Sequence, residues 1–222
     1  MYEGYRDDTK YYSPMTEKDM GKENLNIGQR IIVFIGPEGS GKTTMAKELA
    51  KEGGKPYITT GDIIRDLAAN DTGSLGEECR EMFSTNTYLA GETLLKILTH
   101  RFAREDTENG FVLDGGLRTL EETVNFQNML DTAKRALPLT IIYLQIPNEI
   151  SIERLVVGEN ARKRVDDTIG GVENRLSKFY FQLEERLDHV NDQPNWDLVE
   201  IDATGSVEDV FSQVAVSLRV SL

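Results

Sequence analysis

A glycine-rich segment with one lysine and two threonines has the residue types best suited to chemistry. Residues 36–44 read GPEGSGKTT and fit the pattern G-x-x-x-x-G-K-[ST]. The glycines let the backbone curl so that successive N–H groups point at phosphate oxygens, and a following helix adds its positive N-terminal end. Lys42 supplies a cation for the β- and γ-phosphates, and the hydroxyl of Thr43 or Thr44 can reach Mg²⁺. The segment therefore predicts a nucleoside triphosphate site.

An aspartate and an arginine follow a second apolar segment. Asp114 comes directly after residues 111–113 (FVL), which places it at the carboxyl end of a predicted strand. Ligands of open parallel sheets gather along that edge. There Asp114 can hold the water shell of Mg²⁺, or it can merely cap a helix. Arg118 begins the next helix and should face the same crevice.

The segment TTGDIIR at residues 59–65 allows two interpretations. Thr60 or Asp62 can cap the helix that follows, and Arg65 lies one turn into that helix. Arg65 is then either a solvated surface arginine or a bidentate grip on the phosphate of an acceptor. The segment alone does not decide between the two.

Arginines recur between residues 152 and 175. Arg154, Arg164 and Arg175 lie in a stretch that also contains glycine and two adjacent aspartates, at residues 166 and 167. These arginines are either a solvated face or the charges that stabilise a transferring phosphoryl group, whose transition state spreads charge over several oxygens. The aspartates can pair with the arginines or cap the helix that should begin near Thr168.

Apolar runs alternate with helix-like stretches along the rest of the chain, which predicts an α/β fold. Short continuous apolar runs are typical of strands buried on both faces, and strand–helix alternation favours right-handed crossovers. We expect a five-stranded parallel sheet with helices on both faces. The predicted strands are 31–35, 56–59, 110–113, 140–144 and 198–201, and the predicted helices are roughly 42–53, 62–69, 75–84, 91–104, 119–135, 148–157, 168–190 and 206–219.

Composition excludes several classes of function. The 222 residues carry 25 Lys and Arg against 38 Asp and Glu, a formal net charge of −13. That sign argues against binding to nucleic acid or to an anionic membrane, and no apolar run approaches the roughly 18–20 residues of a membrane span. Cys79 is the only cysteine, which excludes an intrachain disulfide, a cysteine-based zinc site and an iron–sulfur centre.

The two parts of the chain differ in character. Residues 1–29 contain few aliphatic side chains, so we expect a disordered or loosely packed N-terminal tail followed by a single domain over 30–222. The first residues lack the charged-then-apolar pattern of a signal peptide, which predicts a cytoplasmic location.

These segments, in this order, resemble the adenylate kinase family of nucleoside monophosphate kinases from residue 31 to about residue 214. The motifs are specific in combination: the phosphate loop, T-G-D-x-x-R from Thr60, L-D-G-x-x-R from Leu113, R-x-D-D from Arg164 and I-D-x-x-G-S-V-x-x-V from Ile201. The resemblance implies reversible phosphoryl transfer from Mg-ATP to a nucleoside monophosphate. It also implies a monophosphate-binding segment at about 60–90 and a short lid at about 158–167; the absence of cysteine from that lid excludes the zinc-bearing long lid.

Carried over position by position, the resemblance also assigns roles to residues. The implied catalytic residues are Lys42, Arg118, Arg164 and Arg175. The implied ATP-binding residues are Gly39, Ser40, Gly41, Lys42, Thr43, Thr44, Arg154 and Gly205. The implied residues for the monophosphate are Thr60, Arg65, Thr87, Tyr88, Leu89, Gly115, Arg118, Glu122, Arg164 and Arg175. Thr43 and Asp114 would hold Mg²⁺ through water.

Several positions depart from the family pattern. Glu38 stands where the loop commonly has proline, and Thr43 where it commonly has glycine. Residues 116–117 (GL) replace an aromatic–proline pair. Gly158 falls where an arginine usually contacts ATP, so Arg162 or Lys163 can substitute from the lid.

The acceptor base is left open by Glu122. This residue occupies the position where a glutamine usually reads the adenine of AMP, and an ionised glutamate accepts hydrogen bonds but donates none. We expect AMP as the acceptor, in the reaction ATP + AMP = 2 ADP, catalysed by a monomer. The alternatives are a kinase for CMP, UMP or another monophosphate, and a non-catalytic ATP-binding protein with the same fold.

Overall fold

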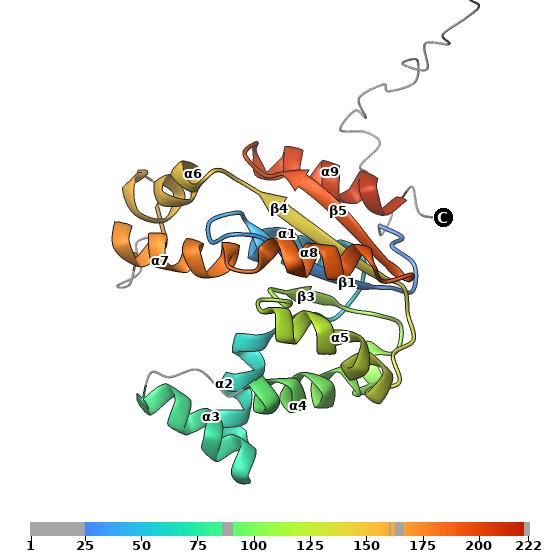
Figure 1. The fold of residues 1–222 in the computed structure, drawn as a ribbon. Coiled ribbons are helices and arrows are strands. Elements are labelled where there is room, and N and C mark those ends of the chain that lie inside the picture. Colours follow the sequence, from blue (N-terminus) through green and yellow to red (C-terminus); the bar gives the residue numbers. More distant parts are fainter. Residues whose placement is uncertain (1–24, 86–90, 160, 163–166, 220–222) are drawn as a thin grey trace, which may run out of the picture.

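The computed structural model describes residues 25–85, 91–159, 161–162 and 167–219 of the chain. Its centre is a sheet of five parallel strands in the order β2-β3-β1-β4-β5. Figure 1 shows the twisted sheet between its helices. The predicted α/β architecture is confirmed. The strands are β1 (Ile31–Ile35), β2 (Tyr57–Thr59), β3 (Val112–Asp114), β4 (Leu139–Gln145) and β5 (Trp196–Asp202).

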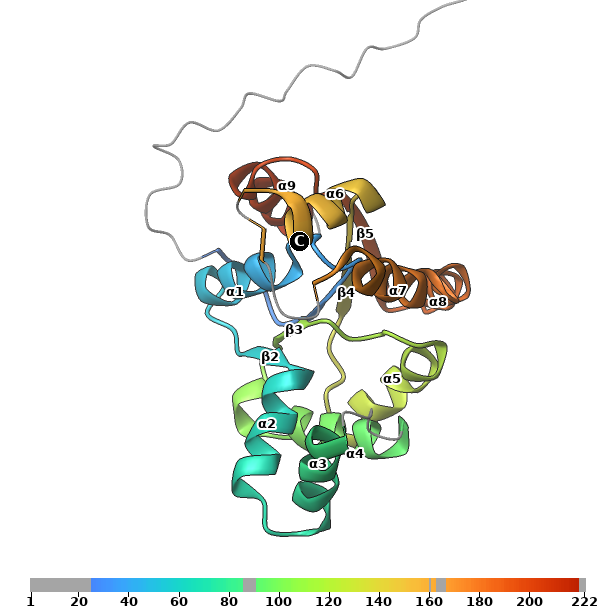
Figure 2. The ribbon, with the colours of Figure 1, turned by 90° about the vertical axis from the view of Figure 1, so that its left-hand side faces the viewer.

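Helices cover both faces of the sheet. On β1, alternate residues belong to different clusters: Ile31, Val33 and Ile35 to one and Ile32 and Phe34 to the other. The first cluster packs against α4 (Gly91–Phe102), α5 (Leu120–Thr132) and α8 (Leu183–Asn191). The second packs against α1 (Lys42–Glu52) and α9 (Val207–Arg219). In Figure 2, α1 and α8 lie on opposite sides of the strands, as expected for a parallel sheet buried on both faces.

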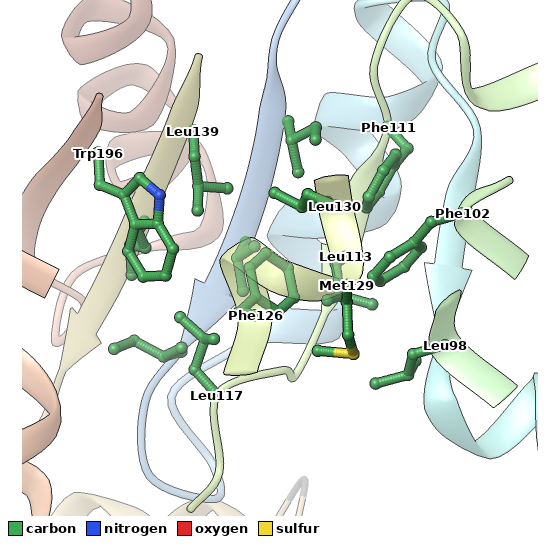
Figure 3. Packing of buried hydrophobic residues seen from close by; sticks show 14 of the residues in the cluster. Leu98, Phe102, Phe111, Leu113, Leu117, Phe126, Met129, Leu130, Leu139 and Trp196 are labelled. Atoms are coloured by element: carbon green, nitrogen blue, oxygen red, sulfur yellow. The ribbon is translucent and has the colours of Figure 1, made fainter. Parts of the chain in front are cut away.

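Aromatic rings fill the core beneath α4 and α5. The rings of Phe102 and Phe111 stack with centroids 4.6 Å apart, and Phe126 meets Phe102 edge-on at 5.8 Å. Trp196 completes the row, with its ring 6.0 Å from that of Phe126 and its indole N–H donating to Oε1 of Gln127 at 3.0 Å (Figure 3). This row joins α4, α5 and the start of β5 into one body.

A second, smaller core lies under the helices that follow β2. These are α2 (Thr60–Asn70) and α3 (Ser74–Thr85), which project away from the sheet in Figures 1 and 2. Ile64, Cys79 and Ile97 are its fully buried members. The cap of α2 is Thr59, whose Oγ1 accepts from the Asp62 N–H at 2.9 Å. The expectation that Thr60 or Asp62 caps this helix is therefore wrong, because Thr60 is already the first helical residue.

The expected helix over 168–190 is two helices. α7 (Ile169–Tyr180) ends before Phe181, and α8 begins after Gln182, whose φ is +56°. The side chain of Arg186 lies at this break: it donates to the Phe179 carbonyl in the last turn of α7, where a helical hydrogen bond is missing, and to the carbonyl of Gln182, the cap of α8. The helical pattern alone did not reveal this use of a side chain.

Two other segments complete the fold. α6 (Asn148–Ile152) runs into a π-helical turn, η2 (Glu153–Val157), and a short 3₁₀ turn, η1 (Glu105–Thr107), precedes β3. Residues 25–29 pack on the body: Leu25 and Ile27 are buried, and the Leu25 N–H donates to Glu52 O at 2.9 Å. The packed part therefore begins before the expected boundary at residue 29. No helix in the described parts of the chain is long and apolar enough to span a membrane.

Replacing Phe102 by alanine should lower the free energy of unfolding by about 3–5 kcal/mol, because the cavity would lie between two fixed rings. Urea denaturation measures this change. Phe181→Ala is the matched control, since it removes the same ring from a position that is 70% exposed, and it should cost well under about 1 kcal/mol. Equal losses in the two variants would contradict this account of the core.

Candidate active site

The phosphate loop leads from the end of β1 into the open N-terminus of α1. Gly41 precedes α1 with a φ of +88°, and no side chain caps the helix. A Cβ added to Gly41 would meet no atom within 4 Å, so space remains in front of the helix. Ser40 is buried, and its hydroxyl has no hydrogen-bond partner within the described part of the chain. This arrangement can receive an anion at the backbone N–H groups.

The Lys42 side chain bends back onto the start of this loop. Its ammonium group donates to the carbonyls of Gly36 and Pro37, each at 2.7 Å. Burial of the ammonium lowers the pKa of Lys42 to about 8, against the opposing effect of Asp114, while the charge of Arg118 lowers it further. A phosphate group would restore the pKa of Lys42 by supplying a nearby negative charge.

Asp114 is held by two hydroxyl groups at the end of β3. Its Oδ2 accepts from Thr43 Oγ1 and from the phenol of Tyr57, both at 2.7 Å. Asp114 is 8% exposed. Burial of the Tyr57 phenol, together with its hydrogen bond to Asp114, raises the pKa of Tyr57. One carboxylate and one hydroxyl beside a phosphate loop are the protein ligands expected for Mg²⁺, which binds few protein groups and completes its shell with water and substrate phosphates. Of Thr43 and Thr44, it is Thr43 whose hydroxyl lies beside Asp114.

Tyr57 was missed by the sequence analysis. Its contact depends on the register of β2 against β3, which pairs Thr59 with Asp114 and Tyr57 with Val112. A phenol two residues before the end of the neighbouring strand then reaches the carboxylate. Nothing in the motif signals this contact.

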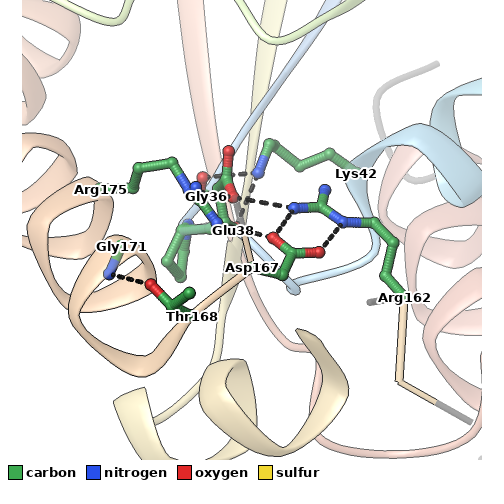
Figure 4. Close-up of polar contacts among 9 residues, drawn as sticks. Gly36, Glu38, Lys42, Arg162, Asp167, Thr168, Gly171 and Arg175 are labelled. Atoms are coloured by element: carbon green, nitrogen blue, oxygen red, sulfur yellow. Dashed lines mark hydrogen bonds and ion pairs between the residues drawn. The ribbon is translucent and has the colours of Figure 1, made fainter. Parts of the chain in front are cut away.

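Two arginines meet the phosphate loop at the carboxylate of Glu38. Arg175, on α7, places Nε 2.8 Å from Glu38 Oε2, and Nη2 of Arg162 lies 3.3 Å from the same oxygen. Both arginines also bind Asp167, whose side chain is fully buried: Arg162 does so through two nitrogens at 2.9 and 2.6 Å, and Arg175 Nη2 at 2.7 Å (Figure 4). Asp167 therefore pairs with the arginines, and Thr168 caps α7 by accepting from the Gly171 N–H.

Glu38 contacts these arginines where a phosphate would be expected. It belongs to the loop that should hold the nucleotide, and its charge also acts on Lys42. A bound triphosphate would offer the same cations more negative charge than one carboxylate. A nucleotide bound to this loop would therefore compete with Glu38 for Arg162 and Arg175.

Arg154 braces the loop from the π-helical turn. It donates to Gly39 O at 3.1 Å and to the carbonyls of Ala203 and Thr204 at 3.0 and 3.2 Å. Gly205 follows directly, at the exposed turn between β5 and α9. Arg154 thus connects the phosphate loop to the segment that contains Gly205, and its guanidinium is hydrogen-bonded to backbone carbonyls.

The predicted monophosphate-binding residues in the described part of the chain lie after β2 and β3. Arg118 is exposed, and its Nε donates to Gly115 O at 3.2 Å. Glu122, in the first turn of α5, accepts from the Arg118 N–H through Oε2 at 2.8 Å. Arg65 pairs with Asp62 on its own helix, and its side chain is 63% exposed. Thr60 is the first residue of that helix. Six further candidates lie outside the described residues: Thr87, Tyr88, Leu89, Lys163, Arg164 and Asp166.

Nucleotide affinity should fall with pH above about 8, because free Lys42 then loses the proton that a bound phosphate retains. The dissociation constant for ATP should be flat between about pH 6.5 and pH 7.5 and should rise by up to about tenfold per pH unit above pH 8. Fluorescence titration measures it. Lys42→Arg should bind without this pH dependence, because guanidinium stays charged. A constant affinity of the unmodified protein up to about pH 9.5 would contradict the lowered pKa.

Replacing Glu38 by glutamine should strengthen the binding of inorganic tripolyphosphate and of ATP. One competing negative charge is removed from Arg162 and Arg175, and we expect a gain of about tenfold, or about 1.4 kcal/mol. Isothermal titration calorimetry measures it. Glu48→Gln is the control, since it removes the same charge from an exposed position on α1. A gain of equal size in the control would assign the effect to net charge alone.

Comparison with known proteins gives a consistent result. The family model described as adenylate kinase matches residues 34–194. An adenylate kinase of Mycobacterium sp. (strain MCS) is 33% identical over 187 residues, covering 84% of this chain and 98% of that protein. An adenylate kinase of Methanosarcina barkeri (strain Fusaro) is 28% identical over 214 residues, covering 85% of this chain and 98% of its own. With a phosphate loop, Asp114 and arginines gathered at one edge of a parallel sheet, the chain belongs to the adenylate kinase family.

Proposed function

We propose that this protein transfers the γ-phosphoryl group of Mg-ATP reversibly to AMP, in the reaction ATP + AMP = 2 ADP. One observation supports the proposal most directly: Lys42, Arg162 and Arg175 converge on the phosphate loop from three different segments. A protein that only holds ATP needs the loop and its lysine, whereas a transferring phosphoryl group needs charges on several oxygens at once. Membership of the adenylate kinase family supports the same conclusion.

In the proposed reaction, an oxygen of the AMP phosphate attacks the γ-phosphorus of ATP. The bond from that phosphorus to the β,γ-bridging oxygen breaks, and ADP forms on both sides. The attacking phosphate is already ionised, so no general base has to remove a proton. Catalysis then rests on positioning and on charge, which is the usual division of work in phosphoryl transfer.

The residues would divide this work by position. The backbone of residues 39–44 and Lys42 would hold the ATP phosphates, and Arg118, Arg175 and Arg164 would orient the two phosphates in line. When bound, Mg²⁺ would neutralise part of the charge on the β- and γ-phosphates, and Thr43 and Asp114 are placed to hold it, directly or through water. Thr60, Arg65 and residues 87–89 would form the pocket for the monophosphate.

We propose a cytoplasmic monomer that binds nucleotides and neither nucleic acid nor membranes, with no zinc. The support is the net charge of −13 and the lack of cysteine in residues 158–167. The segments 60–90 and 158–167 are proposed to be the monophosphate-binding part and the lid of a single domain over 30–222.

The purified protein should form a diphosphate from AMP with Mg-ATP, and much more slowly from CMP, UMP, GMP or dTMP. A coupled assay for each diphosphate measures this. Lys42→Met should reduce turnover by at least about 10²-fold, which excludes a contaminating kinase. A preference for CMP or UMP would replace AMP as the acceptor but keep the chemistry. No turnover with any acceptor, despite tight ATP binding, would overturn the kinase proposal and leave a non-catalytic ATP-binding protein.

A further inference from the structure

The peptide unit between Leu117 and Arg118 is held at both polar atoms by side chains of opposite charge. The Leu117 carbonyl accepts from Nη1 of Arg186 at 2.6 Å, and the Arg118 N–H donates to Oε2 of Glu122 at 2.8 Å. Because a peptide unit is planar, holding its oxygen and its nitrogen fixes the orientation of the whole unit. The main chain from which the Arg118 side chain extends therefore has one orientation.

Arg186 is an unusual residue to find in this place. It is 2% exposed, its guanidinium lies 5.3 Å from the ring centroid of Phe179, and its other nitrogens donate to Phe179 O and to Gln182 O, the latter at 3.2 Å. No ion pair of Arg186 occurs among the described residues. A buried charge is unfavourable unless its hydrogen bonds are satisfied, so an arginine buried at this position requires a structural explanation.

Glu122 is the carboxylate whose charge acts most strongly on Arg186. Burial lowers the pKa of Arg186, and the carboxylate of Glu122 is the strongest of the charges that raise it again. Glu122 is itself fixed, because its own N–H donates to Oγ1 of Thr119, the cap of α5, at 3.1 Å. This reciprocal arrangement is a form of the capping box, here extended to the residue before the cap.

Leu117 shows that the backbone at this point requires support. Its φ is +52°, a left-handed conformation that residues other than glycine rarely adopt, and its side chain is buried in the core. Gln182, at +56°, is another such residue. The carbonyls of both residues accept from Arg186, which thus connects two unfavourable turns.

We infer that Glu122 and Arg186 are positioning residues for Arg118. Together they hold the Leu117–Arg118 peptide, and Arg186 also connects this loop to the end of α7, the helix that carries Arg175. The inference rests on the proposed function, in which Arg118 and Arg175 orient the phosphates. Its consequence is that Glu122 sets the rate of transfer with every acceptor and does not select the base.

The test uses the full-length protein and measures kcat and KM with AMP and with CMP, and the dissociation constant of ATP. Glu122→Ala should lower kcat by about 10- to 100-fold with each acceptor, because a small displacement of a positioning group costs that much. The ratio of AMP to CMP use and the ATP affinity should stay within about twofold. Glu122→Gln, whose amide oxygen can still accept from the Arg118 N–H, should restore most of kcat.

Three further variants separate this role from general stability. Glu121→Ala removes the neighbouring carboxylate from the same helical turn and should leave kcat within about twofold. In an Arg118→Ala background, Glu122→Ala should cause almost no further loss, because the group that it positions is gone. Arg186→Met should show the same pattern, and if it does not fold, the Glu122 variants still decide the question.

The outcomes are distinct. The unmodified protein must turn over AMP; if it does not, the proposed function fails, whatever the variants do. If it does, Glu122→Ala with unchanged kcat overturns the inference, as does a full additional loss in the Arg118→Ala background. A changed ratio of AMP to CMP in Glu122→Gln also overturns it, because Glu122 would then read the base.

Discussion

Cations gathered to bind phosphate repel one another, and this site depends on the carboxylates that balance them. Asp167 is fully buried and binds Arg162 and Arg175, while Glu38 brings both arginines onto the phosphate loop. In such a cluster the arginines are already held near the loop. When a nucleotide binds, they would exchange a carboxylate partner for a phosphate and would not have to be ordered from a solvated state. The arrangement lowers the affinity for a nucleotide, but it places the cations before the nucleotide binds.

The parallel sheet determines which segments can meet at this cluster. β1, β3 and β5 end at the same edge. Asp114 is the last residue of β3, and the segments that follow the three strands carry the phosphate loop, Arg118 and Gly205. Arg154 then joins the first and last of these segments through backbone carbonyls. The phosphate loop is consequently connected to the segment before α9 as well as to Arg162 and Arg175.

The sequence predicted the parts of this structure that depend on short-range pattern. Apolar runs located the five strands, and loop spacing located Lys42 and Thr43. Contacts that depend on how elements pack were not predicted. Tyr57 reaches Asp114 only through strand register, and Thr59 caps α2 one residue before the first position expected for the cap. Nothing in the helical pattern marks Arg186, which donates to a carbonyl at the end of α7 and to the Leu117 carbonyl in the loop of another segment.

The small core under α2 and α3 has a kinetic consequence. With only three fully buried members described, it should open at a lower free energy than the main sheet. One of the three is Cys79, the single thiol of the chain, and burial raises the pKa of that thiol. A thiol reagent therefore reacts only when this core separates, so its labelling rate would time the local opening of the α2–α3 segment without any added probe.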